Sequence, residues 1–198
     1  MKNQQEKINE MTDRELRLNL YITQAIILLI SVILAYWLFD NVSEFLIIWK
    51  WEPISILFWG GGAAACIVVI DFIAMKLLPE RWFDDGGIND RMFRGISVPQ
   101  LMFVTALIGF GEELLFRGIL QTKFGLLFAS IVFALLHVRY ITKPFLFSFV
   151  LLISIAFGYL FEYTGNLLVT IFAHFLVDFI MGLSLRKDPE DGEVCRNL

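Results

Sequence analysis

A pair of glutamates, Glu112 and Glu113, precedes Arg117 in an otherwise apolar stretch. On an α-helix Glu113 and Arg117 are four residues apart, so they share one face and can neutralise each other. Glu112 points about 100° away from Glu113 and has no such local partner. A carboxylate that faces a cavity without a partner suits general-base chemistry near neutral pH. The spacing therefore predicts one structural glutamate, Glu113, and one that is available for catalysis, Glu112.

The two histidines of the chain, His137 and His174, also lie in apolar stretches. Phe133 precedes His137 by four residues, and Asp178 follows His174 by four, so each pair shares a helix face. The second spacing allows a carboxylate to orient an imidazole, or two ligands to reach one metal ion. One interpretation is a metal site in which Glu112, His137 and His174 leave an open position for water. The other is a metal-free hydrolytic site.

The amino-acid composition indicates which kind of structure must position these side chains. The chain has 198 residues, of which 58% are hydrophobic, 15% aromatic and 18% charged, with a net charge of -4. Soluble proteins average roughly 45–50% apolar and about 25% charged residues. A globule of this size cannot bury so much apolar surface, so the excess must face lipid. The composition excludes a soluble enzyme and a disordered chain, and the negative net charge excludes a nucleic-acid binder.

We expect an all-α, polytopic bundle of about six transmembrane spans, or seven or eight if short helices are counted separately. A span needs about 20 mostly apolar residues. The expected spans are 20–39, 54–78, 97–121, 124–138, 145–161 and 167–185. Thr12 and Glu15 form a capping box before the first span, and Ser97 with Pro99 starts the third. A run of small residues at 60–65 predicts close helix packing in the second span.

The distribution of Lys and Arg residues predicts how the chain is oriented in the membrane. With the N-terminus in the cytoplasm, the inner segments hold 13 of the 16 Lys and Arg residues and the outer ones only Lys50 and Lys123. Such a bias is typical of a multi-pass protein of the cell membrane with both termini cytoplasmic. We therefore divide the chain into a cytoplasmic N-terminal segment (1–19), two spans with a polar loop (20–96), a four-helix catalytic core (97–185) and a cytoplasmic tail (186–198).

The ionisable groups of the core are expected at similar depths. Each costs at least about 2.5–3.5 kcal/mol at the centre of a membrane helix, which makes it a functional candidate. Counted from the outer helix ends at about 1.5 Å per residue, Glu112 lies about 13 Å deep and His137 about 20 Å. His174 lies about 10 Å deep and Asp178 about 16 Å on the same scale. Three helices thus bring their polar groups into one layer, which predicts a site.

The motif order resembles that of the CPBP family, the CAAX proteases and bacteriocin-processing proteins, also called the Abi family, which includes the type II CAAX prenyl endopeptidases. The motifs are Glu-Glu-x-x-x-Arg, Phe-x-x-x-His and His-x-x-x-Asp, formed by Glu112, Glu113, Arg117, Phe133, His137, His174 and Asp178. The resemblance implies an intramembrane endopeptidase acting on a membrane-associated protein or peptide. It implies that Glu112 and His137 activate a water molecule, and that His174 and Asp178 stabilise the oxyanion or complete the polar site. Glu113, Arg117 and Phe133 are expected to support the site.

One departure from the family concerns Asp178, where the prenyl endopeptidases have Asn. An ionised Asp cannot donate a hydrogen bond to an oxyanion, so Asp178 must be protonated or must orient His174. The sequence requires no cofactor, and a divalent metal such as zinc stays open. Three alternatives also stay open: a metal-dependent membrane hydrolase, a non-catalytic immunity or scaffold protein, and a proton-coupled transporter. The sequence leaves the oligomeric state undefined.

Overall fold

The computed structural model describes residues 11–186, and these residues form helices and no strands. The first ten residues, and all of the expected cytoplasmic tail (186–198) except Arg186, lie outside the described part. Five long elements carry the fold: α2 (Asp13–Leu38), α5 (Gly61–Leu77), α7 (Val98–Glu113), α10 (Pro144–Thr164) and α11 (Leu167–Leu185). The shorter elements are α3 (Val42–Leu46), α4 (Pro53–Ser55), η1 (Ile56–Gly60), η2 (Glu80–Trp82), α6 (Ile88–Phe93), η3 (Leu114–Gln121), α8 (Thr122–Phe124), α9 (Leu126–Leu136) and η4 (Val138–Tyr140).

The helices begin at the residues that the capping signals predict. Thr12 caps α2 in a reciprocal capping box with Glu15, and the Ser97 side chain caps α7. Between α10 and α11, Gly165 adopts a left-handed conformation and Asn166 caps α11 through its side chain. These caps satisfy backbone N–H groups that would otherwise lack partners at the helix ends.

Among residues 11–186, four helical segments are long and apolar enough to cross a membrane: α2, the continuous segment Pro53–Leu77, α10 and α11. The third and fourth expected spans do not belong to this group, because one is irregular and the other is short. The third is a helical segment from Val98 to Phe124 that changes from α to π geometry at Leu114, next to its charged residues. The fourth is α9, which has only 11 residues. The polar groups are divided between the two kinds of element: His174 and Asp178 lie on the long apolar helix α11, whereas Glu112 and His137 lie at the ends of α7 and α9.

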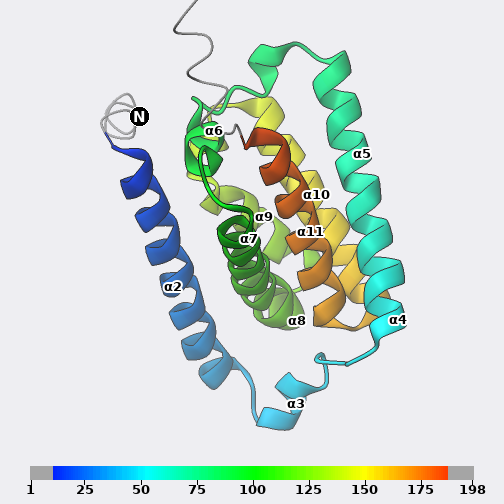
Figure 1. Ribbon diagram of the computed structural model, residues 1–198. Helices are drawn as coiled ribbons and strands as arrows, with labels where there is room; N and C mark the ends of the chain where they lie inside the picture. Colours follow the sequence, from blue (N-terminus) through cyan, green and yellow to red (C-terminus); the bar gives the residue numbers. More distant parts are fainter. Residues whose placement is uncertain (1–10, 187–198) are drawn as a thin grey trace, which may run out of the picture.

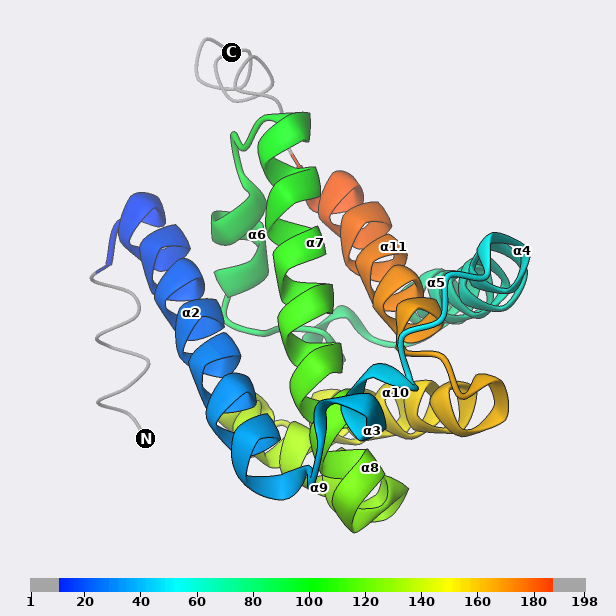
Figure 2. The same cartoon turned by 90° about the horizontal axis from the view of Figure 1, so that it is seen from below.

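Helix α11 lies at the centre of the bundle and packs against α7, α5 and α10. Seen from below in Figure 2, α2, α7, α11 and α5 follow one another in a row, and α9 and α10 cross beside them. The expected close packing of small residues holds at Gly60, where an added Cβ would lie 2.8 Å from the Val169 carbonyl oxygen of α11. Ala64 faces the same contact and is buried, whereas Gly61 and Gly62 have open space around them.

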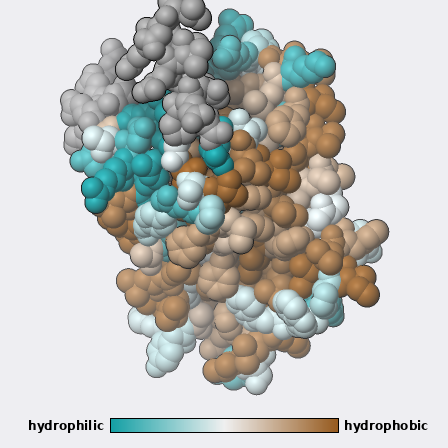
Figure 3. Space-filling view, viewed as in Figure 1, coloured by the Kyte–Doolittle hydropathy of each residue, from teal (hydrophilic) through white to brown (hydrophobic). Residues whose placement is uncertain are grey.

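Polar contacts gather at the two ends of the bundle. At the upper end in Figure 1, Arg91 of α6 pairs with Asp13 at 3.0 Å. At the lower end Lys123 pairs with Glu44 at 2.6 Å, and the hydrogen bond from this ammonium lowers the pKa of the Glu44 carboxyl. Between the ends, Figure 3 shows apolar residues over most of the visible face and hydrophilic ones gathered near the top.

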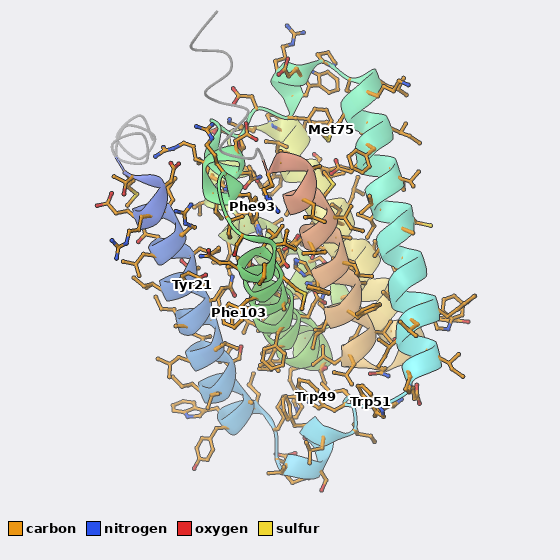
Figure 4. The ribbon with its side chains drawn as sticks, in the orientation of Figure 1. Tyr21, Trp49, Trp51, Met75, Phe93 and Phe103 are labelled. Atoms are coloured by element: carbon orange, nitrogen blue, oxygen red, sulfur yellow. The ribbon has the colours of Figure 1, made fainter. Side chains whose placement is uncertain are left out.

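This division of the surface matches a protein that lies in a bilayer. Large apolar side chains such as Val32, Leu57 and Leu152 are exposed along the long helices, because lipid rather than protein covers them. Trp49 and Trp51 lie at the lower end, as Figure 4 shows, where an aromatic belt at the membrane surface is expected.

Candidate active site

A cavity of about 270 Å³ lies within the bundle and extends to α6 at the upper end. The structure brings all four expected catalytic side chains to its wall: Glu112 from α7, His137 from the end of α9, and His174 and Asp178 from α11. The rest of the wall is mainly apolar, with Phe133, Val150, Ile153, Phe157, Val177 and Met181 among its residues. Phe93 of α6, labelled in Figure 4, lies on the wall near the upper end.

Glu112 occupies the second-last position of α7, and 13% of its side chain is exposed. Its Oε1 accepts a hydrogen bond from Nε2 of Gln24 on α2 at 3.3 Å. Its Oε2 lies 4.0 Å from Nε2 of His174. The carboxylate therefore has one oxygen held by an amide and the other directed toward the imidazole, and it lines the cavity as the sequence predicts.

Glu113 points away from the cavity into the protein, where it is fully buried with Arg117. Oε2 of Glu113 lies 3.3 Å from Nε of Arg117, which is the predicted ion pair across one turn. The Nη2 group of Arg117 donates to the carbonyl oxygen of Ser154 on α10 at 2.8 Å. Its guanidinium also lies 5.1 Å from the centre of the Phe133 ring, a cation–π contact. This pair ties α7 to α9 and α10 from inside the bundle.

His174 contacts carboxylates through both ring nitrogens. Nδ1 lies 2.9 Å from Oε1 of Glu113, and Nε2 lies 3.5 Å from Oδ2 of Asp178. The ring stacks on Phe157, with 5.3 Å between ring centres and an interplanar angle of 26°. Glu113 therefore fixes the imidazole on one side, and Asp178 and Glu112 face it on the other.

His137 is oriented by the helix that ends at it. Its Nδ1 lies 2.8 Å from the Phe133 carbonyl oxygen. Because a carbonyl oxygen only accepts, Nδ1 carries a proton and, in the neutral ring, Nε2 is an acceptor. The ring lies 4.6 Å from that of Phe133 and stacks on Tyr140 at 6.0 Å with an interplanar angle of 14°. Phe133 thus supports His137 through both its backbone and its ring.

Polar side chains also surround the end of the cavity near α6. Arg139 donates to Asn89 at 3.0 Å, and its guanidinium lies 4.6 Å from the Tyr140 ring centre. Burial raises the pKa of the Tyr140 hydroxyl above its usual value, so the phenol stays neutral. All three residues line the cavity.

Sequence reasoning did not identify Gln24, Asn89, Tyr140 or Ser154 as part of this arrangement. A search restricted to ionisable groups at membrane depth passes over an amide or a hydroxyl. The available signal for Gln24 was a polar residue within the first apolar span.

The alternative interpretation of the site is a metal centre with Glu112, His137 and His174 as ligands. Within residues 11–186, no three His, Cys, Asp or Glu side chains come together in an arrangement that could hold a metal ion. Nδ1 of His174 contacts Glu113 and Nδ1 of His137 contacts a backbone oxygen, so Nε2 is the nitrogen of each ring that takes part in neither contact. Glu112, His137, His174 and Asp178 line one cavity, and each carries a side-chain group that can accept or donate a proton.

Comparisons with known proteins give two matches. Residues 94–180 match the family described as "Type II CAAX prenyl endopeptidase Rce1-like", and this range contains all three sequence motifs. Over 177 residues the chain is 39% identical to the uncharacterized protein YpbD of Bacillus subtilis (strain 168), covering 87% of this chain and 94% of the relative. No solved structure matches the chain significantly.

Proposed function

The chain belongs to the type II CAAX prenyl endopeptidase Rce1-like family, a family of membrane proteases, and from this premise we propose that it hydrolyses a peptide bond by glutamate- and histidine-activated water. One observation carries the proposal. Glu112, His137, His174 and Asp178 come from three helices to the wall of one cavity inside an apolar bundle.

Glu112 is the general base of the proposed reaction. Oε1 is occupied by the Gln24 amide, so Oε2 is the oxygen that takes the proton from water. Nε2 of His137 accepts a second hydrogen bond from that water and orients it. The water oxygen forms a bond to the peptide carbonyl carbon, and the carbonyl oxygen becomes an oxyanion. Glu112 then gives its proton to the amide nitrogen, and the C–N bond breaks to leave a carboxylic acid and an amine.

His174 and Asp178 stabilise the oxyanion in this scheme. Protonated His174 donates to Glu113 through Nδ1, which leaves its Nε2 proton directed at the region between Glu112 and Asp178. A charged donor fixed in a site of low dielectric stabilises a developing negative charge strongly. Asp178 orients the imidazole through the contact of its Oδ2 with Nε2 at 3.5 Å. Glu113 and Arg117 keep this ring and α7 in place from the buried side.

The proposed substrate is a membrane-associated protein or peptide that reaches the cavity from the end near α6. We propose a multi-pass protein of the cell membrane with both termini in the cytoplasm. The contacts at the two ends support this arrangement, because Arg91 joins the α6 connection to the start of α2, and Lys123 pairs with Glu44 at the opposite end. The bias of basic residues supports the cytoplasmic assignment of the first end.

A comparison of peptides in cells that express matched variants tests the function. Membrane proteins and secreted peptides are analysed in cells with the wild-type chain, E112Q, H137A or D71N. Asp71 is a half-buried carboxylate on α5 that does not line the cavity, so D71N controls for the loss of an intramembrane charge. We expect a fragment that appears with the wild type and D71N and is lost with E112Q and H137A. Unchanged processing in both site variants would contradict the proposal.

A further inference from the structure

The first helix, α2, lies outside the residues that match the family, yet it reaches the reacting carboxylate through Gln24. Gln24 is 2% exposed although it lies in the middle of a span whose other faces are turned to lipid. Its Nε2 donates to Oε1 of Glu112, a residue 88 positions later in the chain. A buried amide in a lipid-facing helix is unfavourable unless another part of the protein satisfies it.

From this contact we infer that Gln24 is a positioning residue for Glu112, an inference that rests on the proposed function. Amide hydrogens bind one carboxylate oxygen and thereby fix the plane of the carboxyl group. The other oxygen, Oε2, is then left to face His174 and the cavity. The α2 helix is in this way part of the catalytic apparatus and more than a membrane anchor.

The packing of α2 on α7 fixes the amide in this place. Tyr21 of α2 and Phe103 of α7, labelled side by side in Figure 4, have ring centres 6.5 Å apart. One residue before Glu112, an added Cβ on Gly111 would lie 2.8 Å from Oε1 of Gln24. The glycine therefore leaves the space in which the end of the Gln24 side chain can turn its nitrogen toward Glu112.

The amide is not explained by stability alone. Oε1 of Gln24 is buried and has no hydrogen-bond partner among the described residues. An unsatisfied buried acceptor costs free energy, whereas an apolar side chain of similar shape in the same place would not. A side chain that is imperfect for folding but donates to the general base is typical of a functional position.

Three other ionisable groups lie close enough to influence Glu112, and a variant that tests the role of Gln24 must leave all three in place. His174 and Asp178 face it from α11, and Arg117 lies on its own helical segment. Gln24→Met leaves all three unchanged. Methionine has nearly the volume and helix propensity of glutamine but has no donor. Ser31→Ala is the matched control, because Ser31 is also a buried polar residue of α2 and bonds only to the Ile27 carbonyl oxygen of its own helix.

The test measures the full-length protein in three ways. Infrared spectra are recorded for each protein in liposomes and for the same protein carrying the additional substitution E112Q. The difference between the two spectra contains the band of the Glu112 carboxylate. Thermal unfolding is followed in detergent, and hydrolysis is followed with a quenched-fluorescent peptide that carries a farnesylated CAAX sequence. For Q24M we expect a shifted Glu112 band, an unchanged or higher melting temperature, and a kcat lowered about 10–100-fold with little change in KM.

A second variant approaches the same contact from α7. The methyl group of Gly111→Ala is expected to displace the Gln24 amide and to shift the Glu112 band in the same way. S31A is expected to leave the band and kcat unchanged. An unshifted band in Q24M, or a Q24M enzyme with wild-type kcat, would overturn the inference. If the wild type cleaves neither this peptide nor any protein in the cellular comparison while the band still shifts in Q24M, the proposed function fails but the contact stands.

Discussion

Glu113 holds the imidazole of His174 at 2.9 Å, although the two residues lie 61 positions apart and on different helices. The same glutamate forms a buried ion pair with Arg117. One carboxylate thus connects the guanidinium that ties α7 to α10 with the ring that faces the cavity. This relationship gives Glu113 a role in the site itself, beyond holding its own helix.

The buried pair of Glu113 and Arg117 is expected to be strongly coupled. Arg117→Met removes the guanidinium from the buried carboxylate and leaves it only the His174 imidazole, and Glu113→Gln leaves the buried guanidinium without its anion. Each is expected to lower the free energy of unfolding by about 3–5 kcal/mol, because an unpaired buried charge is costly. The double variant is expected to lose much less than the sum of the two. Denaturation in detergent measures all four proteins, and additive losses would contradict the coupling.

Asp178 is expected to tolerate asparagine better than alanine. Its Oδ2 lies 3.5 Å from Nε2 of His174, and its side chain lines the cavity. Asparagine keeps the shape and adds an N–H donor that can reach an oxyanion, so D178N is expected to stay within about tenfold of the wild-type kcat. D178A removes the partner that orients His174 and is expected to lose about 10–100-fold in kcat. The kcat values of the two variants on the same peptide test this expectation. A fully active D178A would contradict a role of Asp178 in the site.

Hydrolysis is expected to be insensitive to metal chelators. The described residues bring Glu112, His137 and His174 to one cavity but not into a metal-binding group. The rate is measured before and after treatment with 1,10-phenanthroline, and the purified protein is assayed for bound zinc. A loss of activity that added zinc restores would instead support the metal-dependent hydrolase.

The proposed orientation predicts which loops a membrane-impermeant thiol reagent reaches. In a chain with Cys66 and Cys195 replaced by serine, Lys50→Cys is expected to react in intact cells. Lys143→Cys, at the opposite end of the bundle, is expected to react only after the cells are permeabilised. The reverse pattern would place both termini outside. Labelling of both positions in intact cells would contradict a single inserted orientation.

The residues that could be predicted from sequence are those whose signal is local. Capping at Thr12 and Ser97 depends on neighbouring residues, and the ion pair of Glu113 with Arg117 depends on one helical turn. The change to π geometry at Leu114 could not be predicted from the neighbouring residues. The contacts of Glu113 with His174 and of Gln24 with Glu112 could not be predicted either, because both depend on how helices distant in the chain pack together. The sequence predicts which residues share a face of one helix, but it does not predict which residue of another helix each of them contacts.

A single-turnover reaction in H₂¹⁸O tests the central claim most directly. Enzyme in excess over a cleavable membrane peptide is mixed with labelled water, and the new C-terminal carboxylate is weighed by mass spectrometry. If Glu112 activates water, the first turnover places one ¹⁸O atom in the product, and E112Q forms no product on the same time scale. An unlabelled product from the first turnover would mean that an enzyme oxygen attacks the peptide bond, and product formation by E112Q at the wild-type rate would remove Glu112 from the mechanism.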